Sequence, residues 1–238
     1  MKNPALTHPE NEVARPSRPF QQVVRLRKAC RKFKPTPVAS EIILSVLEDA
    51  QQSPSNCNTQ PWCTHVVSGE KLQALSAALL QAYEAEAFTP DFSFDVDHFY
   101  GRYGERQQEQ GKAYYESMGV AREDKAGRKA AVEFGYQFFG APHVAFLFLP
   151  SFGDHVRVAG DIGMYGQTFL LSLVDHGLAG IPMTSLGYFA DLIRNVLGVS
   201  DEFKLLFGIP FGYADEEAPG ANFKLGRDPL SSSVVFHH

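Results

Sequence analysis

The amino-acid sequence predicts an α+β fold in one large domain. Helical and strand-like patterns both occur along its 238 residues, but they do not alternate strictly, as they would in a doubly wound sheet. An uninterrupted apolar run at 143–149, rich in aromatic and β-branched residues, indicates a buried strand. A longer segment at 161–176 is apolar on nearly every face and indicates a buried helix. At about 150 residues per domain, we expect a single domain at 19–238, preceded by an extended, proline-rich arm at 1–18.

The other elements follow from hydrophobic periodicity and from residues that begin or end helices. Further helices are expected from about Pro19, from a capping Ser40 to Ser53, at 71–87, near 105–117, near 122–138 and at 188–197. Further strands are expected at 64–67, 179–184 and 203–213. The segment 88–104 is irregular and rich in Phe and Tyr, so we expect an excursion that covers another part of the molecule.

The composition argues against several classes of protein. The formal net charge is −5, whereas a general nucleic-acid binder is usually basic. The three cysteines (Cys30, Cys57 and Cys63) are too few for a disulfide framework, which favours a reducing compartment. No apolar run approaches the roughly 20 residues of a membrane span. We therefore expect a cytoplasmic protein whose partners include neither nucleic acid nor membrane.

One segment concentrates positive charge against this acidic average. Six of the 22 basic residues lie within 25–34, and no acidic residue occurs between Glu12 and Glu41. Such a run is most often a solvated surface. Arginine, however, also binds phosphate through its forked guanidinium group. Because the chain has no glycine-rich phosphate loop, a phosphate at this segment would be held by side chains. The residues alone leave both interpretations open.

Motifs at both ends of the chain resemble those of the FMN-dependent nitroreductase family. Near the N-terminus they read RKACRKF at 27–33 and PSNCNTQPW at 54–62, and near the C-terminus Gly212-Tyr213 is followed by GRDPL at 226–230. Phe139-Gly140-Ala141-Pro142 and Asp161-Ile162-Gly163-Met164 resemble the nitrobenzoate-reductase branch. The resemblance spans about 20–236. It implies a three-layer fold with a mixed central sheet flanked by helices, in an intertwined homodimer.

The resemblance also implies FMN as the cofactor and assigns residues to it. Arg27 and Arg227 would bind the phosphate, with Lys28 and Ala29 beside them, and Arg31 would lie near the ribityl chain and the pyrimidine edge. The isoalloxazine would contact Pro54, Ser55, Asn56 and Asn58 of the partner subunit, and the backbone of Pro182, Met183, Thr184 and Ser185, with Thr184 and Ser185 near N5. Ala29 replaces the family's usual serine, which removes a hydrogen bond of about 1 kcal/mol.

The implied activity is reduction of a nitroaromatic compound by NADH or NADPH, through ping-pong hydride transfer at flavin N5. No side chain is expected as a catalytic acid or base, because the matched motifs hold no histidine or carboxylate in such a place. A quinone, an enone, free flavin or a halogenated phenol are alternative acceptors, and a flavin-binding protein without activity is a further alternative. No metal site is expected, because Cys57, Cys63 and His65 lack a fourth ligand.

Two further expectations concern the substrate and the partner subunit. The region 88–138 is expected to be an aromatic and helical insertion over the active site. In it, Phe99, Tyr100 and Tyr103 are candidate contacts for a flat aromatic substrate, since they lie close to Arg102 and Arg106. The apolar helix at 161–176 is expected at the dimer interface. Trp62 is expected as a packing residue.

Overall fold

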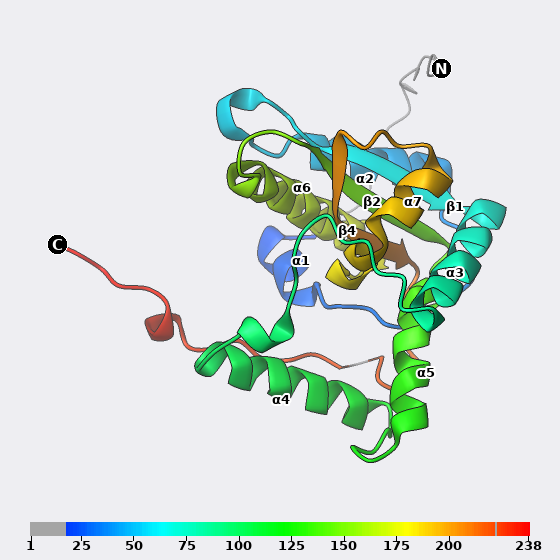
Figure 1. The fold of residues 1–238 in the computed structure, drawn as a ribbon. Coiled ribbons are helices and arrows are strands. Elements are labelled where there is room, and N and C mark those ends of the chain that lie inside the picture. The colour runs from blue at the N-terminus through cyan, green and yellow to red at the C-terminus, as the bar shows by residue number, and fades with distance from the viewer. Residues whose placement is uncertain (1–17, 222) are drawn as a thin grey trace.

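The computed structural model describes residues 18–221 and 223–238, and a four-stranded sheet lies at its centre (Figure 1). The strand order is β1-β2-β4-β3, with β1 at Cys63–Ser68, β2 at His143–Pro150, β3 at Ala179–Gly180 and β4 at Phe203–Gly212. The buried strand predicted at 143–149 is confirmed as β2, whose residues are buried except for Pro150.

All three strand pairings are antiparallel, so the sheet is not mixed within the described residues. The reason is that the excursions 69–142 and 181–202 each return the chain to the end of the sheet that it left. The parallel component is one isolated bridge between Ala29 and Gly180.

Helices cover both faces of the sheet and give three layers, as the resemblance implies. Their bounds are α1 Phe20–Leu26, α2 Ser40–Gln51, α3 Gly69–Glu84, α4 Arg102–Ser117, α5 Lys125–Tyr136, α6 Val156–Asp175 and α7 Ala190–Leu197. One core cluster joins α2 and α6 to one face of β2, and a second cluster joins α3, α5 and α7 to the other face. This alternation follows from the two-residue repeat of a strand, which sends Ala145 and Leu147 to one layer and Val144 and Phe146 to the other. The α+β class is confirmed.

The α6 helix differs from its prediction in its start and in its exposure. It begins at Val156, so Asp161 lies inside the helix and is buried rather than capping the N-terminus. The carboxylate of Asp161 accepts the backbone N–H of Asn56 at 3.1 Å instead. The helix is not buried on every side in this single chain. One face stays exposed, along Val156, Gly160, Gly163, Met164 and Gln167.

Several other predicted boundaries shift for local reasons. Ser40 is the first residue of α2 rather than its cap, and the cap position is held by Ala39. The strand predicted at 179–184 is only two residues long; beyond Gly180 the pairing with β4 continues as one isolated bridge, between Met183 and Gly208, before a 3₁₀ helix begins at Thr184–Phe189. That 3₁₀ helix delays the start of α7 to Ala190.

The region after α3 leaves the three layers. It runs as an irregular segment to α4, which lies apart from the sheet, and the C-terminal segment passes alongside α4 before it leaves the body (Figure 1). Arg106 of α4 forms an ion pair with Asp228, and Arg102 donates to the carbonyl of Ser232 at 3.0 Å.

The N-terminal arm predicted at 1–18 lies outside the described residues, apart from Arg18. Within the described part of the chain, no helix has the length and apolar character needed to cross a bilayer.

Candidate functional site

The basic segment predicted as a phosphate site lies along the edge of the sheet. After α1 ends, Ala29 pairs with Gly180, and the N–H of Cys30 donates to the Gly180 carbonyl at 3.4 Å. The side chains of Cys30 and Phe33 are buried, and Phe33 forms a further bridge to Ala214. These contacts fix the backbone between Arg27 and Lys34, and with it the starting points of the basic side chains.

Segments from both ends of the chain and from α4 form a pocket of about 190 Å³, which we call the arginine pocket. It is lined by Arg27, Lys28, Ala29, Arg31, Gln110, Phe223, Lys224, Leu225 and Arg227. Every charged residue in this lining is basic. The structure therefore brings together the N-terminal residues predicted for the phosphate and Arg227 from the opposite end of the chain.

Hydrogen bonds hold the C-terminal wall of the arginine pocket against its N-terminal wall. The ammonium group of Lys28 donates to the carbonyl of Ala221 at 2.8 Å, and that of Lys224 donates to the carbonyl of Arg25. Arg227 donates to the carbonyl of Gly226 at 2.9 Å. Because each wall donates a lysine hydrogen bond to the backbone of the other, the fold itself fixes the relative positions of Arg27 and Arg227.

The arginines of this pocket are held in an electrostatically unfavourable arrangement. Burial lowers the pKa of Arg27, and the nearby charge of Arg227 lowers the pKa further. Burial also lowers the pKa of Arg31, whose guanidinium lies 4.5 Å from the ring centroid of Tyr114 and 5.6 Å from that of Phe223. Within residues 18–221 and 223–238, no carboxylate forms an ion pair with these three arginines.

This donor set fits a phosphate monoester such as that of FMN. A phosphate bound between Arg27 and Arg227 would replace their repulsion by charge-assisted hydrogen bonds. The aromatic side chains beside Arg31 add a flat apolar wall, which suits the part of a ligand beyond its phosphate. Ala29 lines the pocket with a methyl group, so the hydroxyl donor that serine would supply is absent.

The segment predicted to face the flavin N5 follows directly on the strand that pairs with Ala29. Met183 and Gly208 exchange two backbone hydrogen bonds of 2.8 and 3.2 Å, and the Met183 side chain is buried. Pro182 and Thr184 are exposed, and Ser185 is half-buried. Because Gly180 forms a bridge with Ala29 and its carbonyl accepts the N–H of Cys30, the structure brings 182–185 next to the basic segment.

The second predicted flavin-binding group does not join the arginine pocket in the single chain. Pro54, Ser55, Asn56 and Asn58 lie in the loop between α2 and β1, and none of them lines that pocket. The loop is fixed by the bond from Asn56 to Asp161 and by the N–H of Gln60, which donates to the Ser55 hydroxyl at 2.9 Å. Cys57 and Asn58 have positive φ, a conformation that asparagine adopts more readily than most residues.

Trp62 packs as predicted. Its ring stacks on Tyr165 with centroids 5.0 Å apart, and its indole N–H donates to the Gln51 side chain at 2.7 Å.

The three aromatic residues predicted for the substrate line one cavity of about 330 Å³, which we call the aromatic pocket. Phe99, Tyr100 and Tyr103 share its walls with His98, Arg106 and Gln107. A hydrogen bond from Arg102 lowers the pKa of Tyr103. The Arg106–Asp228 ion pair connects the aromatic pocket to the arginine pocket, since Asp228 is the neighbour of Arg227.

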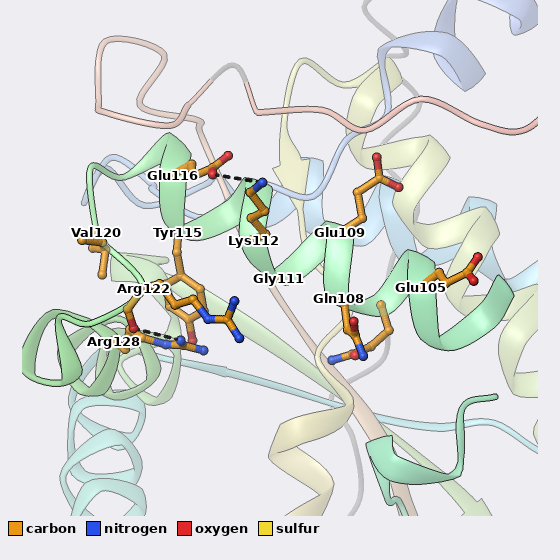
Figure 2. Close-up of a pocket in the computed structure, with 12 residues that line it drawn as sticks. Glu105, Gln108, Glu109, Gly111, Lys112, Tyr115, Glu116, Val120, Arg122 and Arg128 are labelled. Carbon is orange, nitrogen blue, oxygen red and sulfur yellow. Dashed lines mark hydrogen bonds and ion pairs between the residues drawn. The ribbon is translucent and has the colours of Figure 1, made fainter. Parts of the chain in front are cut away.

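A larger cavity, of about 810 Å³, lies elsewhere on α4 and at the start of α5 (Figure 2). Some of its polar groups contact one another. Lys112 pairs with Glu116 at 3.8 Å, and Arg128 lies over the Tyr115 ring and donates to the carbonyl of Arg122. We place the candidate site at the arginine pocket, where every charged side chain is positive and the charge of Arg227 lies near Arg27.

The described residues include no group of three or more His, Cys, Asp or Glu side chains that could hold a metal ion. The Cys63 thiol lies 3.5 Å from a ring nitrogen of His65, and Cys57 is exposed elsewhere.

Gln110 and Phe223, which line the arginine pocket, and Tyr114, which lies beside Arg31, were not predicted from the sequence. No motif marks them. Tyr114 and Phe223 come together through the packing of α4 on the C-terminal segment, with ring centroids 6.2 Å apart. The resemblance could not reach α4, because the 88–138 region interrupts it.

Comparison with known proteins identifies a family. The family model described as the nitroreductase family matches residues 24–213. Nitroreductase NfnB of Mycolicibacterium smegmatis is 39% identical over 216 residues, which cover 91% of this chain and 92% of that protein. The 4-nitrobenzoate reductase of Pseudomonas putida is 34% identical, covering 91% and 95%.

A solved structure of a nitroreductase is also similar to this chain over most of its length. The crystal structure of the FMN-dependent nitroreductase NfnB from Mycobacterium smegmatis in complex with NADPH superimposes with a TM-score of 0.88 at 38% identity, covering 92% of this chain and 97% of that one. The sequence motifs, the three-layer fold and these matches agree, and the chain belongs to the nitroreductase family.

Proposed function

We propose that this protein is an FMN-dependent oxidoreductase that reduces nitroaromatic compounds with electrons from NADH or NADPH. The arginine pocket carries the proposal, because Arg27 and Arg227 converge there without an acidic partner among the described residues. Two relatives give further support: one is named for 4-nitrobenzoate, and the other is described as FMN-dependent and in complex with NADPH. Of the two nucleotides, that complex favours NADPH.

In the proposed mechanism, the side chains of this protein bind and orient, and none acts as an acid or base. Arg27 and Arg227 would hold the phosphate, and Lys28 and Ala29 would complete that end of the site. When bound, FMN supplies the centre that accepts a hydride and passes electrons on to the acceptor. Arg31 would stabilise negative charge on the reduced ring. The backbone at 182–185 would lie against the ring, with Thr184 and Ser185 near N5, and water would supply the protons.

The aromatic pocket is the proposed place of the acceptor. Phe99, Tyr100 and Tyr103 offer ring surfaces that suit a flat aromatic compound. The pocket belongs to the 88–138 region, which we propose as an insertion over the active site of the single domain at 19–238.

We further propose a homodimer. The exposed face of α6 presents Gly160 and Gly163, where an added Cβ would meet no atom within 4 Å, together with Met164. Such a face allows close packing of a second helix. The loop residues Pro54, Ser55, Asn56 and Asn58 lie at the N-terminal half of this helix, so a second copy seated on it would bring them to the partner's flavin. The apolar tail at 234–236 could then reach the partner.

A cytoplasmic location is part of the proposal and is supported by the three free cysteines. The test of the proposed function is direct. The purified protein is expected to bind FMN, to reduce that flavin with NADPH in the absence of oxygen, and to return it to the oxidised form with 4-nitrobenzoate. A panel of quinones, enones and free flavin then measures the acceptor preference. Failure to take up FMN would refute the proposal.

A further inference from the structure

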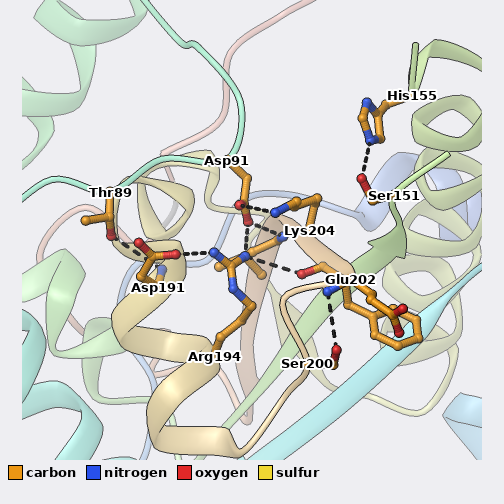
Figure 3. Close-up of polar contacts among 11 residues, drawn as sticks. Thr89, Asp91, Ser151, His155, Asp191, Arg194, Ser200, Glu202 and Lys204 are labelled. Carbon is orange, nitrogen blue, oxygen red and sulfur yellow. Dashed lines mark hydrogen bonds and ion pairs between the residues drawn. The ribbon is translucent and has the colours of Figure 1, made fainter. Parts of the chain in front are cut away.

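The segment that leads to the aromatic pocket is anchored by a buried carboxylate (Figure 3). Asp91 lies ten residues or fewer from each aromatic residue at 94–100, and its side chain is only 5% exposed. It accepts hydrogen bonds from the Arg194 guanidinium of α7 and from the backbone N–H of Leu205 in β4, the latter at 2.8 Å. The ammonium group of Lys204 lies 3.6 Å from its other oxygen. Asp91 thus fixes the segment 88–101, which we call the aromatic segment, to α7 and β4.

Arg194 pairs with Asp91 and also with a second carboxylate, which is not part of the aromatic segment. Its side chain is 6% exposed and also bonds the carboxylate of Asp191, which belongs to α7 and is 58% exposed. Burial acts to lower the pKa of Arg194, but the hydrogen bonds and charges of Asp91 and then Asp191 raise it above its ordinary value. A buried carboxylate and guanidinium are retained as ions only while paired, so loss of the Asp91 charge would release the segment.

Tyr188 makes a second connection between the aromatic segment and the body of the fold. It lies close in sequence to residues 182–185, which are proposed to face the flavin. Tyr188 belongs to the 3₁₀ helix Thr184–Phe189. Its carbonyl accepts the N–H of Thr89 at 2.7 Å, and its hydroxyl donates to the carbonyl of Phe94 at 3.3 Å. The rings of Tyr188 and Phe94 are 6.1 Å apart, and those of Phe94 and Phe99 are 6.2 Å apart. A continuous series of contacts therefore runs from 184–189 to the aromatic pocket.

We propose that Asp91 and Tyr188 are positioning residues that determine which acceptors the protein prefers. They hold the aromatic segment at one distance from the 182–185 backbone, and so fix the space between the aromatic pocket and the place of the flavin. This inference rests on the proposed function. Reaction rates depend on placement to within about an ångström, so a loosened segment should change acceptor kinetics before it changes cofactor binding.

The test compares Asp91→Asn with Asp191→Asn in the FMN-loaded enzyme. Both carboxylates pair with Arg194, but only Asp91 belongs to the aromatic segment, so Asp191→Asn controls for the loss of a charge next to Arg194. For Asp91→Asn we expect the KM for 4-nitrobenzoate to rise at least fivefold. The kcat/KM for NADPH and the FMN dissociation constant should stay within twofold of wild type. Asp191→Asn should match wild type in all three. Equal effects of the two variants, or equal changes for NADPH and 4-nitrobenzoate, would overturn the inference.

A structural readout accompanies the kinetics. In Asp91→Asn, amide hydrogen exchange should accelerate at 88–101 and stay unchanged in β2 and α6. Unchanged exchange at 88–101 would contradict the anchoring role. Wild-type enzyme that neither binds FMN nor oxidises NADPH would instead refute the proposed function, which separates the two failures.

A milder variant keeps the inference testable should Asp91→Asn not fold. Tyr188→Phe removes only the hydroxyl that donates to Phe94 and leaves the ring contacts in place. The ratio of kcat/KM for 4-nitrobenzoate to that for nitrobenzene should shift at least threefold. Tyr83→Phe is the matched control, since Tyr83 packs on Tyr136 rather than on the aromatic segment. An unchanged ratio in Tyr188→Phe, or an equal shift in Tyr83→Phe, would overturn the inference.

Discussion

Arg27 and Arg227 line the same pocket from opposite ends of the chain, and the charge of Arg227 lowers the pKa of Arg27. Two like charges in a partly buried place repel each other, and folding alone gives no reason to keep them together. An anion bound between them turns this repulsion into attraction. The pair therefore explains why a mildly acidic protein carries a concentrated basic segment.

Ala29→Ser should strengthen FMN binding. A serine hydroxyl at this position of the arginine pocket would add one hydrogen-bond donor toward the phosphate, worth about 1 kcal/mol, or roughly a fivefold lower dissociation constant. Fluorescence titration of the apoprotein with FMN measures the change. Ala39→Ser, at the N-cap position of α2, is the control and should leave FMN affinity unaltered. Weaker binding by Ala29→Ser would show that position 29 does not face the phosphate.

Gly163→Arg should convert the proposed dimer into a monomer. An arginine side chain meets no atom within 4 Å at its Cβ in the single chain, so the fold should tolerate it, whereas a helix packed on this face should not. Light scattering after gel filtration should show half the wild-type mass, with weakened FMN binding as well. Gln73→Arg, on the exposed face of α3, should remain dimeric. A dimeric Gly163→Arg with normal FMN affinity would rule out α6 as the interface.

Stability should fall as the pH drops below about 6.5, in part through His143. Burial lowers the pKa of His143, and its Nε2 accepts the N–H of Val38 at 2.9 Å, which only a neutral nitrogen can do. The unfolded chain binds the proton first, near its ordinary pKa of about 6.5. The stabilisation is therefore present above that pH and is lost as the pH falls toward the lower folded pKa, by at most about 1.4 kcal/mol per pH unit.

Urea unfolding at pH 7.5 and 5.5 measures this loss. His143→Gln should reduce the pH dependence of the unfolding free energy. His65, whose pKa burial also lowers, should account for part of the slope that remains. An equal slope in wild type and His143→Gln would refute the assignment.

Phe99→Ala and Tyr103→Ala should alter acceptor preference without altering FMN affinity. Both side chains line the aromatic pocket, and removing a ring takes away contact surface for a flat substrate. Relative kcat/KM across 4-nitrobenzoate, nitrobenzene and a quinone should change at least threefold. Phe152→Ala, at an exposed phenylalanine outside this pocket, supplies the comparison. The acceptor site lies elsewhere if all three variants keep the wild-type profile.

Local sequence patterns predicted those helices and strands whose own hydrophobic pattern shows which of their faces must be buried. The apolar run of β2 has to be buried, and the one-sided periodicity of α2 and α3 requires a layer on one face. The start of α6 was missed because Asp161 followed by apolar residues is typical of a helix N-terminus. Its partner, the N–H of Asn56, is a tertiary contact that no local pattern encodes.

The residues of the candidate site also differ in whether a local sequence pattern identifies them. Arg27, Arg31 and Arg227 belong to recognised motifs. All three line the arginine pocket, as expected from the roles that the resemblance implies for them. Gln110 and Tyr114 could not be predicted from the sequence, since their positions depend on how α4 packs against 219–221 and 223–227. The Asn56 loop was recognised by its motif. None of its predicted flavin contacts lines the arginine pocket of the same chain, and for this reason we propose that a second copy supplies them.

The most direct test of the arginine pocket compares FMN with riboflavin, which lacks the phosphate. Dissociation constants for both flavins are measured with wild type, Arg227→Ala, and Arg25→Ala, whose side chain is exposed and does not line the pocket. Wild type should bind FMN at least a hundredfold more tightly than riboflavin. Arg227→Ala should lose at least tenfold of that preference while its riboflavin affinity stays unchanged, and Arg25→Ala should match wild type. Equal affinity of wild type for the two flavins, or a preference for FMN that survives in Arg227→Ala, would contradict the assignment of this pocket to the flavin phosphate.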